Sequence, residues 1–424
     1  MKKFVMDNIR IAYITPEAPP FSGGGIATFI NNITKGMKKA DVYCEVFAPS
    51  DTGHTGTAML NGVPVHRIAV PESSSFKNEI VPFFLSRHEE VHFTIVESCE
   101  IHASLFELIK NKRPELKYVI RVQMPVVLQM KLNLTYQSIP SKLRYVLGAF
   151  RRFRWDLGFW NRMDVKRESN PEYLVCEQAD AIIAPSYSFK EWLTNFWKLP
   201  EEKISVIPHL FDFSTMEQVM GKVSERDNHI TRILFTGKLN VHKGVINLAK
   251  AANLLLKKYP NVEFILVGED WPSVYGNRTV KTSELIRYIT NNHPAVKLAG
   301  KIPYNEMAQY YAEGDICIFP SLWEAWGYTC TEAMSMGKAV IGSKYGGMAD
   351  AIKHGENGLL IDPYDYMDIA EKIEQLINNK ILRDKLGSAA RETIHNELSF
   401  ERLVRKNIDF YEKDLPKGRP PRRA

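Results

Sequence analysis

The sequence lacks a long hydrophobic run. The strongest apolar stretches, 264–268 and 316–320, end after a few residues, far short of the roughly 20 residues that a membrane-spanning helix needs. The amino terminus begins with two lysines, but Asp7 and Arg10 interrupt any hydrophobic core of a secretory signal. We therefore expect a cytoplasmic protein that does not cross the membrane.

Cysteine is also scarce. The five cysteines are odd in number and show no C-x-x-C spacing, which argues against a disulfide framework or a zinc site. We interpret them as packing residues in a reducing compartment.

The composition is that of an ordinary globular protein of two or three domains, with 424 residues of which 45% are hydrophobic and 25% charged. Short β-rich runs alternate with helical patterns, which is typical of parallel βαβ units. The predicted strands lie near residues 9–15, 42–48, 63–68, 94–96, 118–122, 181–185, 205–208, 232–237, 262–268, 296–300, 316–320 and 339–342. A polar stretch near 209–230 predicts the joint between two α/β layers, and a ligand is expected between them at the carboxyl ends of the strands.

The net charge of +6 is concentrated in two places. Residues 141–168 hold eight Lys or Arg against three Asp or Glu, interleaved with aromatic residues, and residues 415–424 hold four basic residues and no acid. Segment 141–168 suits an anionic membrane surface, a lipid-diphosphate acceptor or RNA, or it forms a helix with a solvated basic face. The proline-rich tail is expected to be disordered.

A glycine-rich loop follows the first predicted strand. Gly24 and Gly25 stand between that strand and a helix beginning at Ile26, where backbone could approach a phosphate or a sugar. The spacing matches neither the dinucleotide fingerprint nor the P-loop. A plain tight turn is the alternative.

A second loop, Gly237 to Gly244, also lies between a strand and a helix. Its lysines, Lys238 and Lys243, suit a diphosphate at a helix N-terminus. The alternative is a pair of exposed lysines on a loop. His242 could bind a ligand, although a single loop histidine is usually solvated.

A third loop begins after the strand that ends at Pro320. Glu324 lies in this loop and Glu332 lies in the second turn of the helix that Gly327 precedes. The amides at the start of that helix are free to hold an anion. Two solvated carboxylates would be the alternative.

These motifs resemble the retaining GT-B glycosyltransferases of family four over nearly the whole chain. The resemblance rests on EAWGYTCTE with the residues that follow it to Pro363, on GKLNVHKG, on ADAIIAPS and VIPHLFD, and on SGGGIA. It implies two Rossmann-like, doubly wound parallel-sheet domains that face each other across a cleft. Residues 1–210 would bind the acceptor, rejoined by a helix at 398–414, and residues 211–397 would bind a nucleotide-sugar donor.

The resemblance also implies roles for individual residues. Glu324 contacts hydroxyls of the transferred sugar, Glu332 binds the ribose, and carboxylates suit both tasks. The diphosphate is held by Lys238 and Lys243 with backbone at Gly237 and at Trp326, Gly327, Tyr328 and Thr329, and the glycine loop at Gly24 and Gly25 lies nearby. No D-x-D sequence occurs that could place a metal on the diphosphate, so we expect transfer without a metal. We also expect no cofactor besides the substrate, a nucleotide sugar. UDP- or GDP-sugars are the expected donors.

The chain departs from the family pattern at two positions. Lys238 stands where relatives usually carry Arg, which keeps the charge and loses the bidentate fork. Gln123 stands where relatives usually carry His, and an amide orients hydroxyls but does not titrate. If Gln123 is not the counterpart, His102 or His92 could serve.

We therefore expect a metal-independent, retaining glycosyltransferase that acts on a glycan or lipid-linked acceptor, without nucleic acid as a partner, at the inner face of the membrane. Two other functions remain open. One is a nucleotide-sugar epimerase on the same fold, and the other is a nucleotide-sugar-binding protein without catalysis.

Overall fold

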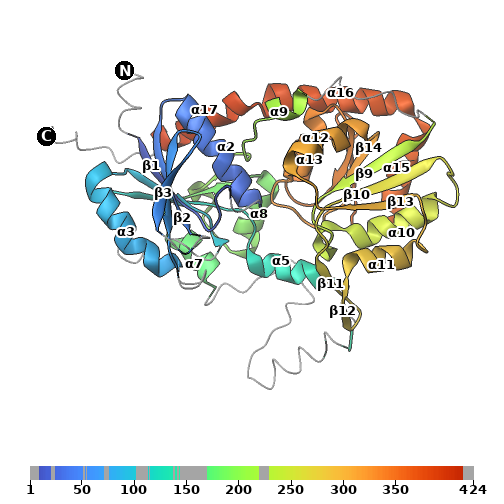
Figure 1. The fold of residues 1–424 in the computed structure, drawn as a ribbon, viewed down its shortest axis with the longest axis horizontal. Coiled ribbons are helices and arrows are strands. Elements are labelled where there is room, and N and C mark those ends of the chain that lie inside the picture. The colour runs from blue at the N-terminus through green and yellow to red at the C-terminus, as the bar shows by residue number, and fades with distance from the viewer. Residues whose placement is uncertain are drawn as a thin grey trace.

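A computed structural model shows two α/β halves side by side, with the first and the last described segments of the chain both in the N-terminal half (Figure 1). The structure describes residues 9–20, 24–50, 53, 55–70, 76–101, 113, 115–136, 139–140, 143, 170–218 and 229–413.

The N-terminal half is built on an eight-stranded sheet in the order β3-β4-β2-β1-β5-β6-β7-β8. All neighbouring pairs are parallel except β3 with β4. Its strands are β1 (Arg10–Ile14), β2 (Tyr43–Pro49), β3 (Gly56–Leu60), β4 (Val63–Ile68), β5 (Ile95–Ser98), β6 (Lys117–Arg121), β7 (Ala181–Ala184) and β8 (Ile204–Val206).

The C-terminal half is built on a six-stranded parallel sheet in the order β13-β10-β9-β14-β15-β16. A separate antiparallel hairpin, β11 with β12, leaves it after β10. The strands of this half are β9 (Thr231–Thr236), β10 (Val262–Val267), β11 (Pro272–Tyr275), β12 (Arg278–Lys281), β13 (Val296–Gly300), β14 (Ile316–Phe319), β15 (Ala339–Ser343) and β16 (Leu359–Ile361). Every predicted strand is present, whereas β3, β11, β12 and β16 were not predicted.

Helices connect the strands and cover the sheets. They are α2 (Gly25–Lys39), α3 (Phe76–Val91), α5 (Val126–Asn133), α7 (Pro171–Gln178), α8 (Tyr187–Phe196), α9 (Ser214–Glu217), α10 (Val245–Leu255), α11 (Thr282–Ile289), α12 (Tyr304–Glu313), α13 (Tyr328–Ser335), α14 (Met348–Ala351), α15 (Tyr366–Asn378), α16 (Lys380–Glu397) and α17 (Phe400–Lys413), with 3₁₀ turns η3 (Glu201–Lys203) and η4 (Val241–Lys243). Among the described helices, none is both long enough and apolar enough to cross a bilayer.

The C-terminal helix α17 returns to the N-terminal half and lies beside α2 (Figure 1). Its apolar face, with Phe400, Leu403 and Tyr411, is buried in the same cluster as Ile30 and Ile33 of α2. At roughly 25 cal/mol for each Å² of apolar surface removed from water, this burial is what holds α17 in place. The chain therefore crosses between the halves twice.

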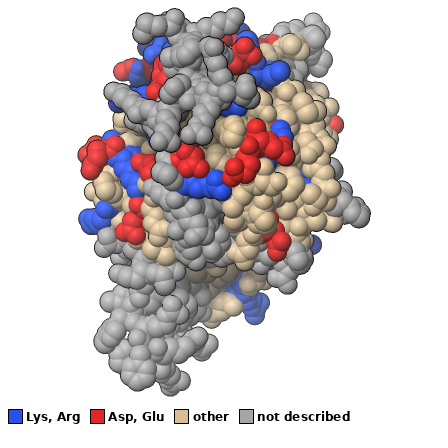
Figure 2. Space-filling model, turned by 90° about the vertical axis from the view of Figure 1, so that its left-hand side faces the viewer, with Lys and Arg blue, Asp and Glu red and all other residues tan. Residues whose placement is uncertain are grey.

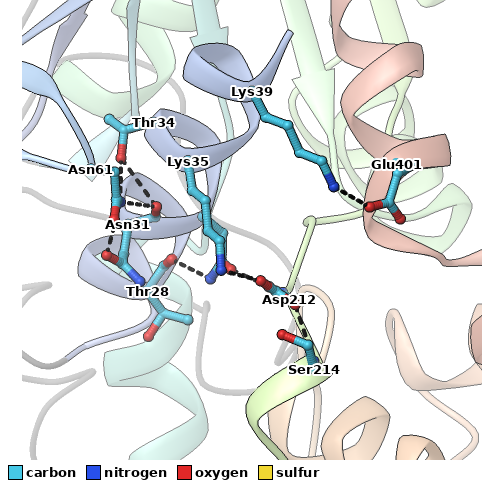
Figure 3. A network of polar contacts seen from close by, with 10 residues as sticks. Thr28, Asn31, Thr34, Lys35, Lys39, Asn61, Asp212, Ser214 and Glu401 are labelled. Atoms are coloured by element: carbon cyan, nitrogen blue, oxygen red, sulfur yellow. Dashed lines mark hydrogen bonds and ion pairs between the residues drawn. The ribbon is translucent and has the colours of Figure 1, made fainter.

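The linker after β8 is fixed to α2 by side-chain contacts (Figure 3). Asp212 accepts from Lys35 and also from the amide of Ser214 at 3.0 Å, and its own amide donates to Asn32 at 2.9 Å. Lys39 on the same helix bonds Glu401 at the start of α17 at 2.6 Å. Both crossings between the halves are thus attached to one helix.

Figure 2 shows the end of the molecule that the N-terminal half forms. Basic and acidic side chains are interspersed over the atoms drawn in colour, and the described residues include exposed ion pairs such as Arg113 with Glu89 at 3.0 Å. Segment 141–168, apart from Leu143, and segment 415–424 lie outside the described residues. The predictions of a membrane contact and of a disordered tail therefore rest on sequence alone.

Candidate active site

The candidate site lies at the carboxyl ends of β9 and β14. These two strands are neighbours in the C-terminal sheet, and the strand order reverses direction between them. At such a point of a doubly wound sheet the loops after the two strands run to opposite faces and leave a crevice for a ligand. The loop after β9 carries Lys238 and Lys243, and the loop after β14 carries Glu324. The sequence motifs of this half therefore meet at one edge.

Lys243 and Glu324 form an ion pair at this edge. The Lys243 Nζ lies 2.7 Å from Oε1 and 2.6 Å from Oε2 of Glu324, and both side chains are mostly buried. Burial acts to raise the pKa of Glu324, but the Lys243 ammonium and neighbouring donors together outweigh it, so the pKa lies below its ordinary value. Glu324 is therefore an anion at neutral pH, with lone pairs available to hydroxyl groups.

Two glycines bring these loops into contact. Gly244 has φ +74°, and a Cβ there would lie 1.7 Å from the carbonyl oxygen of Pro320. Gly346 has φ +80°, and a Cβ there would lie 2.2 Å from the carbonyl oxygen of Glu324. Side chains at either position would separate the loops, so glycine is required for the pairing of Lys243 with Glu324.

Helix α13 begins beside this pair. Gly327 is its N-cap with φ +104°, no side chain caps it, and its first turn holds no acidic residue. The ring of Trp326 is buried, and the backbone at Tyr328 and Thr329 forms the first turn. This N-terminus is open to an anion because its first amides have no partners within the helix.

Glu332 lies in the second turn of α13 and is only 5% exposed. The Tyr311 hydroxyl donates to its Oε2 at 2.8 Å. Burial raises the pKa of Glu332 to about 7, and the bond from Tyr311 opposes the rise. The structure therefore replaces the solvated alternative with a buried carboxyl that titrates near neutrality.

This shift predicts that stability falls as pH rises. In the unfolded chain Glu332 loses its proton near the ordinary value of 4.5, whereas the folded protein keeps it to about 7, so the native state binds more protons between these values. The contribution of the protonated Glu332 to the free energy of unfolding is complete below pH 4.5 and is lost above pH 7. Urea unfolding at pH 5, 6, 7 and 8 should show a shallower decline for Glu332→Gln than for wild type. The exposed Glu356→Gln variant is the control, and equal slopes for wild type and Glu332→Gln would contradict the assignment.

Lys238 occupies a different setting from Lys243. It is exposed, and its Nζ lies 4.3 Å from the ring centroid of Trp271. Gly237 before it has φ +146°, and a Cβ on the facing Gly268 would lie 1.8 Å from the carbonyl oxygen of Gly237. The loops after β9 and β10 are therefore packed backbone to backbone.

His242 is not a solvated loop residue, contrary to the sequence-based expectation. It is 3% exposed, its amide donates to Asn133 of α5 at 3.3 Å, and its carbonyl accepts from Leu322 at 2.7 Å. Burial first and Lys243 second lower its pKa to about 3. The imidazole ring is buried because η4 packs between α5 and the loop after β14. With its pKa lowered in this way, the imidazole is neutral.

The N-terminal half presents Gly24, Gly25 and Gln123 at its own strand ends. Gly24 is the N-cap of α2, and no atom would contact a Cβ on Gly25. Gln123 follows β6, is half-buried, and lines a small cavity with Arg121 and Phe29. These positions lie after the strands β1 and β6, on the edge where an acceptor is expected.

Glu100 fixes the backbone at Gln123. Its two carboxylate oxygens accept from the Gln123 amide at 3.0 and 2.9 Å, and burial first and Glu172 second raise its pKa to about 8. Of the alternative histidines, His92 precedes β5 and so lies at the opposite edge of the sheet, while His102 is outside the described residues. Gln123 remains the candidate on this strand edge.

Sequence reasoning missed the residues that join the two halves. The Ser186 hydroxyl donates to the carbonyl of Ala325 at 2.8 Å, next to Glu324. Asp350 accepts from the amide of Tyr187 and from the Ser188 hydroxyl, the latter at 2.7 Å. No local pattern could reveal these bonds, because the partners lie more than 130 residues apart.

Comparisons with known proteins agree with this architecture. The family model described as "Glycosyl transferases group 1" matches residues 220–393, and that described as "Glycosyltransferase Family 4" matches residues 23–214. A curated relative, the D-inositol 3-phosphate glycosyltransferase of Pseudarthrobacter chlorophenolicus, is 24% identical over 89% of this chain and 88% of its own.

Two solved structures share the fold. The sucrose-phosphate synthase of Thermosynechococcus elongatus has a TM-score of 0.74 at 18% identity, covering 96% of this chain and 98% of the other. The Anabaena protein HepE in complex with UDP-glucose has a TM-score of 0.67 at 16% identity, covering 96% of this chain and 100% of the other. The two family models together match residues 23–214 and 220–393. With the two solved structures they confirm the predicted architecture of two Rossmann-like domains. The chain is a glycosyltransferase of family 4 with the GT-B fold.

Proposed function

We propose that the protein is a retaining, metal-independent glycosyltransferase that moves a hexosyl residue from a nucleoside-diphosphate sugar to a glycan or lipid-linked acceptor. The observation that carries the proposal is the Lys243–Glu324 pair beside the open N-terminus of α13. One site then offers a cation and free amides to a diphosphate, and a carboxylate to sugar hydroxyls. The complex of HepE with UDP-glucose supports a UDP-sugar as donor, and a GDP-sugar is the second candidate.

Negative charge grows on the diphosphate as the bond between the sugar and the phosphate breaks. Lys243, Lys238 and the first amides of α13 stabilise this charge, and groups that are fixed before the reaction do so without reorganising. Glu324 holds hydroxyls of the sugar and Glu332 those of the ribose. Gln123 orients hydroxyls from the acceptor half.

Transfer with retention proceeds on one face of the sugar. The bond from the anomeric carbon to the phosphate oxygen breaks while the acceptor oxygen bonds the same carbon, and the acceptor proton passes to the leaving phosphate. This route needs no titrating side chain, which is compatible with Gln123 in place of a histidine. The neutral His242 also fits, because it is not required to carry a proton.

The donor can be identified with a thermal-shift panel of UDP, GDP, ADP and dTDP and their sugars. A ligand at 100 times its dissociation constant adds about 2.7 kcal/mol to the free energy of unfolding. Incubation of the stabilising nucleotide sugar with and without an acceptor mixture then separates three functions. A transferase releases nucleoside diphosphate only with acceptor, an epimerase converts the donor alone, and a binding protein does neither.

We expect activity to persist in excess chelator. Two lysines and a helix N-terminus balance the diphosphate, and the chain has no D-x-D sequence to place a metal on it. Turnover measured with EDTA should match turnover without it. Complete loss with EDTA, restored by magnesium or manganese, would contradict this part of the proposal.

Peripheral association with the inner face of the membrane is the proposed location. Residues 141–168 and 415–424 carry net charges of +5 and +4, and each basic residue near an anionic surface contributes about 1 kcal/mol. Co-sedimentation with anionic vesicles should exceed that with neutral vesicles and should fall as salt rises, because salt screens such charges. Equal binding to both lipids would assign segment 141–168 to a solvated surface.

A further inference from the structure

Lys238 differs from Lys243, the other lysine of the loop after β9, in the groups that contact its ammonium. Lys243 forms an ion pair with Glu324. Lys238 forms no ion pair with any described residue, although its charge contributes, after the hydrogen bond from Trp271, to lowering the pKa of the neighbouring Glu269, and its ammonium lies 4.3 Å from the ring centroid of Trp271. An aromatic face attracts a cation without cancelling its charge.

Trp271 is fixed in place by two hydrogen bonds. Its indole Nε1–H donates to the Glu269 carboxylate at 3.0 Å, and its backbone amide donates to the carbonyl of Leu239 at 3.1 Å. The amide of Leu239 in turn donates to the carbonyl of Glu269 at 2.8 Å. The segment that carries Trp271 is thus bonded on both sides to the residue after Lys238.

This arrangement bears on how a flexible lysine can bind a diphosphate. A lysine has a flexible stem, and fixing it costs rotamer entropy. An ammonium that already rests on a fixed ring needs less ordering when an anion binds. The ring also leaves the positive charge available to a phosphate.

We propose that Trp271 is a positioning residue that presents the Lys238 ammonium to the diphosphate of the donor. The inference rests on the proposed function, because it requires a nucleoside diphosphate in this site. It assigns part of the donor-binding energy to the loop after β10, which has no motif of its own.

A double-mutant cycle in diphosphate affinity tests the proposal. The full-length protein, Trp271→Leu, Lys238→Met and the double variant are titrated by calorimetry with whichever of UDP, GDP, ADP or dTDP the wild type binds. Trp271→Leu keeps apolar bulk and removes the ring, and it should weaken binding about 2- to 5-fold, which corresponds to about 0.5–1 kcal/mol. In the Lys238→Met background the same change should have no effect, since no cation remains to be held. Trp271→Phe restores a ring and should bind within about 2-fold of wild type.

Folding and matched controls keep the result interpretable. Trp271 is 43% exposed, so the variants should unfold at temperatures close to wild type without nucleotide, and Tyr288→Ala, on the exposed surface of α11, should bind as wild type. Equal weakening in both backgrounds would show that the indole contacts the nucleotide directly and would overturn the proposal. Unchanged or tighter binding by Trp271→Leu would overturn it as well. A wild-type protein that binds none of the four diphosphates would contradict the proposed function itself.

Discussion

Lys243→Ala is expected to lower turnover about 10²-fold or more, the range found when one preorganised electrostatic group is removed from an active site. In the proposed mechanism Lys243 faces negative charge that grows as the bond from sugar to phosphate breaks. Its loss should also weaken the binding of the free nucleoside diphosphate, because that anion is present in both complexes. Initial rates of diphosphate release with the identified donor and acceptor measure the first effect.

The structure supplies a matched control for this variant. Lys353 pairs with Glu397 at 3.0 Å on the surface, and exposed pairs of this kind contribute little to stability. Lys353→Ala should therefore leave turnover unchanged. Lys243→Ala leaves the mostly buried Glu324 without its partner, which lowers stability. The double variant Lys243→Met with Glu324→Gln removes both charges. Comparing the unfolding temperatures of the two variants therefore separates a loss of stability from a loss of chemistry. Near wild-type turnover by Lys243→Ala would contradict the role given to this lysine.

Glu324→Gln is expected to lower turnover by a similar factor of about 10² through a different step. In the proposed complex the carboxylate contacts the transferred sugar and not the nucleotide, and an amide of the same shape loses the charge and one acceptor. The affinity for free nucleoside diphosphate should stay unchanged or rise, since Lys243 is released from its ion pair. Glu397→Gln is the matched control on the exposed pair. Full activity of Glu324→Gln would contradict the assignment of the sugar end.

Much of the fold follows from local pattern. Strands such as β9 and β14 are runs of branched and aromatic residues buried on both faces, and this pattern predicts central strands of a parallel sheet. The edge strand β3 was missed because its residues are exposed and include glycine, so that no apolar alternation marks them. The hairpin β11–β12 was missed for the same reason, since it is largely exposed.

The candidate site was predictable only in its parts. Loops between strands and helices placed Lys243 and Glu324 at strand ends, but the bond between them joins residues 81 positions apart. The backbone amide of His242 bonds Asn133 of the other half, and the partner of Glu332 is a tyrosine of α12 that resembles any core tyrosine. Trp271 is one tryptophan of seven in the sequence, and the packing of Gly268 on Gly237 together with the backbone bonds of Leu239 brings it to Lys238. Long-range contacts of this kind leave no periodic signal.

Calorimetric titration with the free nucleoside diphosphate separates the roles proposed for Lys243 and Glu324, and it needs neither acceptor nor turnover. Lys243→Ala is expected to weaken the affinity markedly, whereas Glu324→Gln is expected to bind as tightly as wild type or more tightly. If Glu324→Gln abolishes binding while Lys243→Ala leaves it intact, the two ends of the donor are reversed and the assignment of the site is wrong.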